Sequence, residues 1–291
     1  MLSELLTIKT NKLMWALLIL VAMVLLIVTG CNSIDRSIKT PIETKKPIAE
    51  VQFGSSPLDV IGQKIYNNET GGNVNNLIFW STNEGFASLG VGHFIWYPEG
   101  KIQRFKQTFP DMIRYLKANG SDVPDWLLQQ IKVGSLWNSR EELEQARDSE
   151  RFLALQKLLI DTSGLQVSYL FQRLDKALPR ILTALNPASH DIITRRFNRL
   201  KNTPGGLYPL VDYVNFKGEG SVPAEGYKGE GWGLLQVLET MEDTPSGPEA
   251  LAAFSTAAEK VLTRRVSNSP PERNEQRWLP GWRVRLMTYT L

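Results

Sequence analysis

The sequence has 291 residues, with 33 Lys and Arg, 30 Asp and Glu, and a formal net charge of +3. So small a net charge gives no electrostatic case for nucleic-acid binding. The single cysteine, Cys31, excludes an internal disulfide framework and a cysteine-based zinc site. The two histidines, His93 and His190, are too few for a His-rich metal centre, so we expect no metal and no nucleic acid as partner.

The N-terminus has the pattern of an export signal. Two lysines precede an uncharged apolar run at residues 13–30, as in a signal peptide. The run ends in VTGC, which resembles the lipobox of bacterial lipoproteins and implies cleavage before Cys31 and a diacylglycerol on its thiol. Asn32 follows, which by resemblance to the Gram-negative sorting rule implies an outer-membrane lipoprotein facing the periplasm. The alternative is an inner-membrane anchor formed by residues 13–30, a run just long enough to span a bilayer.

Composition divides the rest of the chain into a tether and a domain. After the signal peptide (1–30), residues 31–56 are polar, contain two prolines and show no sustained period, so we expect a flexible tether. Residues 57–291 are long enough for one domain of two lobes. We find no internal repeat.

The predicted elements of this domain begin with a short helix over 59–68, stopped by Gly71 and Gly72. Residues 73–83 are rich in Asn and predict a loop, and residues 86–97 predict a tight hairpin or small sheet. Everything beyond is expected to be helical. The expected helices are one that opens at a capping box at Ser139 and runs toward 160, one over 165–185 that Pro179 should kink or split, and others at 207–216, 232–241 and 248–266. The predicted fold class is therefore α+β: mostly helical, with one small antiparallel sheet near the front.

A glutamate at the end of the first helix, Glu69, is followed by the run EGFASLGVGH at residues 84–93. This arrangement resembles the front of phage-type lysozymes, in which a catalytic Glu closes the first helix and a hydroxyl residue precedes Gly-x-Gly-His on a hairpin. The resemblance implies that Glu69 is the general acid and that Ser88 holds water or a sugar hydroxyl. The residues implied to shape the cleft and bind substrate are Glu84, Gly90, Gly92 and His93.

Further segments, in order, resemble the C-terminal lobe of the same family. They are 214–220, 234–238, 257–260 and 269–273, with 221–231 as an insertion. The resemblance implies a lysozyme-like fold with a cleft between a small front lobe (about 57–105) and a helical lobe (about 106–291). The middle of the chain, about 98–205, matches only as helical segments.

The expected chemistry needs a carboxyl group and no cofactor. Cleavage of a glycosidic bond needs an acid that protonates the leaving oxygen. A Glu at a helix C-terminus faces the negative end of the helix dipole, which disfavours its charged form. The expected function is cleavage of the β-1,4 bond after N-acetylmuramic acid in peptidoglycan glycan strands, by a monomeric protein that its lipid anchors to the membrane.

One departure from the family leaves the reaction open. The lysozymes carry an Asp six residues before the hydroxyl residue, where this chain has Thr82; Glu84 is close but offset. A single carboxyl group suits lytic transglycosylation, in which the muramyl 6-hydroxyl attacks. The run GWGLLQ at 231–236 also echoes such enzymes, with Glu219 upstream as their catalytic residue. A non-catalytic peptidoglycan-binding lipoprotein is the remaining alternative.

Overall fold

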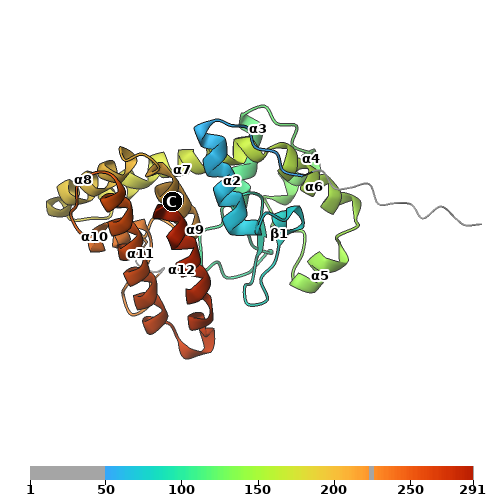
Figure 1. Ribbon diagram of the computed structural model, residues 1–291. Coiled ribbons are helices and arrows are strands. Elements are labelled where there is room, and N and C mark those ends of the chain that lie inside the picture. Colours follow the sequence, from blue (N-terminus) through green and yellow to red (C-terminus); the bar gives the residue numbers. More distant parts are fainter. Residues whose placement is uncertain (1–49, 223–225, 291) are drawn as a thin grey trace, which may run out of the picture. The chain divides into compact units, whose positions relative to one another are not determined.

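The computed structural model describes residues 50–222 and 226–290 (Figure 1). The predicted signal peptide, Cys31 and nearly all of the tether lie outside the described residues, as do three residues of the predicted insertion. Residues Ile48–Leu291 form one compact unit. Within the part that is described, no helix is both long enough and apolar enough to cross a bilayer.

The first described helix, α2 (Pro57–Thr70), contains the predicted helix and has a cap at each end. The Ser56 hydroxyl accepts the backbone N–H of Asp59, whose carboxylate accepts the N–H of Ser56 in return. Gly71 ends the helix in the left-handed conformation, with φ of 66°. The helix is two residues longer at each end than predicted.

The predicted small sheet is confirmed and has three antiparallel strands in the order β1-β2-β3. They are β1 (Ile78–Phe79), β2 (Ala87–Leu89) and β3 (Phe94–Trp96). Ser88 lies at the centre of the middle strand, opposite Phe79 and Ile95.

The loop predicted over 73–83 is wrong in part, because it contains both β1 and a 3-10 helix, η1 (Val74–Leu77). The Asn73 side chain accepts the N–H of Asn75 and so starts η1. Leu77 and Ile78 are fully buried, which fixes this polar segment to the core.

The predicted helix from 139 toward 160 is two helices. Ser139 caps the first, as expected, but Ser149 caps a second by accepting the N–H of Phe152. The helices of this middle region are α3 (Phe109–Ala118), α4 (Asp125–Gln130), α5 (Arg140–Gln145), α6 (Glu150–Asp161) and α7 (Ser163–Thr183).

Pro179 does not split α7, which runs unbroken from Ser163 to Thr183. Proline removes one helix hydrogen bond. Here it lies near the end of a helix whose apolar face stays buried on both sides of it, through Leu174, Ala177 and Ile181. Burial of that face keeps the last turn helical.

The named elements of the C-terminal part are all helices, joined by loops. Its elements are η2 (Pro187–Ser189), α8 (His190–Lys201), α9 (Leu207–Lys217), α10 (Leu234–Thr240), α11 (Pro248–Asn268), η4 (Pro271–Arg273), η5 (Glu275–Trp278), α12 (Leu279–Met287) and η6 (Thr288–Thr290). Helix α7 packs against α2 and α3 as well as α8 and α9, and α11 packs against α10 and α12. The α+β class, mostly helical with one small sheet, is confirmed.

Candidate active site

A groove of about 600 Å³ lies at the end of α2. Its walls come from the three strands, the segment after β3, the end of α9, and the segments around α11 and α12. The groove is lined by five of the six residues predicted for the cleft: Glu69, Glu84, Ser88, Gly92 and His93. The sixth, Gly90, is buried, and a β-carbon there would lie 2.3 Å from Oε1 of Gln166.

Glu69 is held at the groove by residues from distant parts of the chain. Its side chain is 13% exposed. Oε1 accepts hydrogen bonds from Arg285 Nη2 at 2.8 Å and from Asn215 Nδ2 at 3.0 Å. Oε2 has no such donor and lies 3.5 Å from Nδ1 of His93. When Glu69 carries a proton, that proton therefore belongs on Oε2.

His93 is oriented by a backbone carbonyl. Its Nε2 lies 2.8 Å from the carbonyl oxygen of Asn76, which can only accept, so Nε2 carries a hydrogen. In the neutral ring Nδ1 is then a hydrogen-bond acceptor that faces Glu69. The contact between Nδ1 and the Glu69 carboxyl group is favourable when the two side chains share one proton. The ring stacks on Phe79, and the backbone has a positive φ of 46°.

Asn215 links Glu69 to the sheet and to α7. Its Nδ2 also donates to the carbonyl of Gly92 at 2.9 Å, and its Oδ1 accepts from Arg173 at 3.1 Å. A β-carbon on Gly92 would lie 3.1 Å from Asn215 Oδ1 and 3.0 Å from Phe94. Gly92 thus permits close packing behind Glu69.

A buried ion-pair network supports Glu69 from behind. Arg285 donates to both oxygens of Asp212 at 2.7 Å, and Asp212, which is fully buried, also accepts from the Tyr289 hydroxyl at 2.5 Å. Burial lowers the pKa of Arg285, but the carboxylates of Asp212 and Glu69 outweigh it and hold that pKa well above its ordinary value. Arg285 is therefore a permanent cation beside Glu69.

Lys217 lies in the groove between two aromatic rings. Its Nζ is 3.8 Å from the centroid of Phe216 and 3.7 Å from that of Trp282. Burial, and then the charges of Arg265 and Arg285, lower the pKa of Lys217 well below its ordinary value. The groove thus holds the Lys217 amine against flat apolar surface, beside the cation Arg265.

Glu84 is a second carboxyl group of the groove. Burial raises its pKa, and the charges of Arg273, Arg104 and Arg265 oppose that effect only in part. Thr82 is exposed and is not among the residues that line the groove. The loop therefore brings Glu84, and not Thr82, to the groove.

Glu219 does not line the groove. Its carboxylate pairs with Arg180 at 2.7 Å, in a neighbouring cavity. The predicted insertion contributes Tyr227, whose hydroxyl accepts from Arg104 and donates to Glu275 at 2.7 Å. Glu275 is itself buried in a two-bond ion pair with Arg265.

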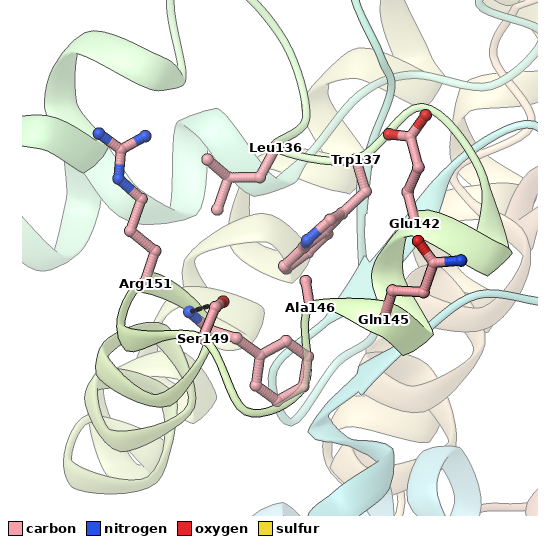
Figure 2. A pocket seen from close by; sticks show the side chains of 8 residues that line it. Leu136, Trp137, Glu142, Gln145, Ala146, Ser149 and Arg151 are labelled. Carbon is pink, nitrogen blue, oxygen red and sulfur yellow. Dashed lines mark hydrogen bonds between the residues drawn. The ribbon is translucent and has the colours of Figure 1, made fainter.

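A separate hollow of about 410 Å³ lies between α5 and α6 (Figure 2). Trp137 lies at its centre, with Arg151 on one side and Glu142 and Gln145 on the other. Glu142 already accepts the backbone N–H of Asn138 at 2.8 Å, so its carboxylate has a local structural role. None of the predicted site residues lies here, so the groove at Glu69 is the stronger candidate.

Sequence reasoning missed Asn215, Asp212 and Arg285. Asn215 stands in a segment that the family resemblance already singled out, which was the available signal. Arg285 is one of several C-terminal arginines that the sequence does not distinguish, and the structure shows that Arg265 and Arg285 are buried and paired. In the described part of the chain, no group of His, Cys, Asp and Glu side chains has the arrangement of a metal site.

No family model, curated protein or solved structure matches the chain.

Proposed function

We propose that this protein cleaves the β-1,4 bond after N-acetylmuramic acid in peptidoglycan, with Glu69 as the general acid. The observation that carries the proposal is the position of Glu69 on the groove, with Oε1 tied to Arg285 and Asn215 and Oε2 free of donors. Oε2 would give its proton to the glycosidic oxygen. The carboxylate left behind would be stabilised by the charge of Arg285.

The same groove supports a substrate that is a sugar polymer. Phe79, Phe86, Phe105 and Trp278 line it beside Ser88, which combines flat surfaces for sugar rings with a hydroxyl that can hold a sugar hydroxyl or water. The neutral His93 ring would accept a hydrogen bond at Nδ1 from a proton on Oε2 of Glu69.

The missing Asp favours the transglycosylase outcome over hydrolysis. Thr82 stands where the lysozymes carry that Asp, and it has no carboxyl group. Attack by the 6-hydroxyl of the muramyl sugar needs no residue that positions water, and it gives a 1,6-anhydro product.

The location that goes with this activity is the periplasmic face of the outer membrane, with Cys31 as the lipid attachment point. The lipobox resemblance supports this part of the proposal. Peptidoglycan lies within reach of a domain on a short polar tether.

The test is digestion of purified sacculi with mass analysis of the soluble products. Glu69→Gln should lower product release about 10²- to 10⁴-fold, the usual contribution of a general acid. It should keep its thermal melting transition, since Gln retains an acceptor for Arg285 and Asn215. Glu99→Gln, at an exposed turn, is the control for loss of one carboxyl group.

The products separate the alternatives. Anhydro ends indicate transglycosylation and reducing ends indicate hydrolysis. Glu219→Gln should cost less than tenfold; a loss as large as that of Glu69→Gln would move the centre to Glu219. Full release by Glu69→Gln would remove Glu69 from the mechanism, and sacculi that are bound but intact would identify a binding protein.

A further inference from the structure

A second cavity, of about 370 Å³, adjoins the groove where α3 packs against α7. The two hollows share Lys106, Thr108 and Arg173 in their walls. We call this cavity the side alcove. A ligand in the groove therefore has a lateral space into which a branch can extend.

The alcove has more positive than negative groups. Its two carboxylates are both engaged: Asp111 pairs with Arg114 at 2.7 Å, and Glu219 pairs with Arg180 at 2.7 Å. Among the described residues, its other cations have no carboxylate within salt-bridge distance. They are Lys106, Arg173 and Lys176.

Arg173 is the least compensated of these cations. Its guanidinium has five N–H donors, and the described residues supply one acceptor, Oδ1 of Asn215. Burial lowers its pKa, and the nearest negative groups only partly oppose this. An anion beside Arg173 would accept hydrogen bonds from its guanidinium group and would also balance its charge.

The alcove also lies next to the reacting group. Arg173 contacts Asn215, and Asn215 contacts Glu69, so one side chain separates the cation from the proposed acid. A branch reaching Arg173 must therefore come from a sugar close to the bond that is cleaved. Lys176 and Lys106 extend the positive surface beyond it, toward solvent.

We propose that the side alcove binds a carboxylate on a branch of the glycan next to the cleaved bond, so that the substrate is a strand with anionic branches. This inference rests on the proposed function, because it takes the strand to lie in the groove at Glu69. In peptidoglycan the shared chemistry, a carboxylate, has two sources: the lactyl group of a muramyl residue without peptide, or an attached stem peptide. A neutral polymer of N-acetylglucosamine offers neither.

The test measures binding to the full-length Glu69→Gln protein, which leaves the ligand uncleaved. The probes are tetrasaccharides of alternating N-acetylglucosamine and N-acetylmuramic acid, with free lactyl carboxylates or with stem peptides, each also prepared with its carboxylates amidated. Amidation should weaken binding about tenfold or more, the value of one hydrogen bond between charged groups. A loss with the lactyl probe assigns the lactyl source, and a loss only with the peptide probe assigns the stem.

Two matched double variants complete the test. Adding Lys106→Gln and Lys176→Gln should reduce the preference for the charged probe several-fold, with the remainder owed to Arg173. Adding Lys132→Gln and Lys157→Gln, two exposed lysines outside the alcove, should keep the preference. Equal binding of charged and amidated probes by Glu69→Gln, or an unchanged preference after loss of the alcove lysines, would overturn the inference.

The two experiments distinguish a failure of this inference from a failure of the proposed function. Release of soluble products from sacculi by the wild-type protein, without a charge preference in the binding assay, overturns the anionic branch and keeps the cleavage. A charge preference without product release keeps the alcove and overturns the enzyme.

Discussion

Glu84 lies at the point where the chain departs from the family that it resembles. The residue that a hydrolase would use to hold water is expected at 82, and an exposed Thr stands there. Glu84 reaches the groove instead, in a setting in which burial raises its pKa. Its protonation state therefore bears on stability.

We predict that Glu84→Gln stabilises the protein at neutral pH. A carboxyl group whose pKa is raised by folding binds more protons in the folded than in the unfolded state. Its contribution to the unfolding free energy therefore falls as the pH rises from the ordinary Glu pKa, about 4.3, to the raised pKa of the folded state. Gln does not titrate, so the Glu84→Gln protein does not lose this stability as the pH rises. The gain should be present at pH 7 and shrink as the pH falls through about 4.3.

Urea denaturation of both proteins across this pH range gives the measurement. Glu99→Gln is the reference for removing one exposed carboxyl group. A gain from Glu84→Gln that grows on acidification would have the wrong sign and would contradict the raised pKa.

Among the elements, the turn between β2 and β3 was predicted from its glycines, but the reason for one of them differs. Gly90 was expected to shape the cleft and bind substrate. It lies instead against Gln166, whose Oε1 accepts the N–H of Val91 at 2.8 Å and whose Nε2 donates to Leu159 and Thr162. This glutamine anchors the turn to the buried junction of α6 and α7.

We predict that Gly90→Ala destabilises the protein by about 1–3 kcal/mol more than Gly100→Ala. Both glycines have positive φ, 75° and 70°, so both substitutions carry the left-handed cost of about 1–2 kcal/mol. Only at Gly90 would the new β-carbon meet Gln166, since nothing lies within 4 Å of it at Gly100. Chemical denaturation measures the difference; equal losses would mean that Gln166 moves aside freely.

Sequence patterns predicted an element well where neighbouring residues determine its ends. The stop at Gly71 and Gly72 predicted the end of α2, and the flanking turns predicted the sheet. Two boundaries depended on context that no window contains. The break at Ser149 comes from a second cap inside an otherwise helical stretch, and Pro179 is tolerated because a buried apolar face continues past it.

For the whole molecule, the limit of sequence reasoning lies in long-range pairing. The front motif placed Glu69, Ser88 and His93 on one groove because they are close in the chain. Arg285 is 216 residues from Glu69, and Asn215 is 146 residues away. No spacing rule connects them, and a C-terminal arginine looks the same in sequence whether it is solvated or buried.

These pairs also join the two ends of the domain, because Arg285 on α12 contacts Glu69 on α2 and Asp212 on α9. We predict that Arg285→Met costs about 3–5 kcal/mol of stability, because Asp212 would stay buried without its cation. For a domain with a total stability of about 5–15 kcal/mol, that is a large fraction. Urea denaturation at neutral pH measures the loss.

The same helix offers a matched control. Arg283 also pairs with a carboxylate, Glu259 at 2.8 Å, but both side chains are about half exposed. An exposed pair contributes about 0–1 kcal/mol, so Arg283→Met should cost far less than Arg285→Met. If Arg285→Met is costly because Asp212 is left buried without a cation, adding Asp212→Leu should recover part of the lost stability. Further destabilisation by Asp212→Leu would show that Asp212 contributes through its other partners, Asn68 and Tyr289.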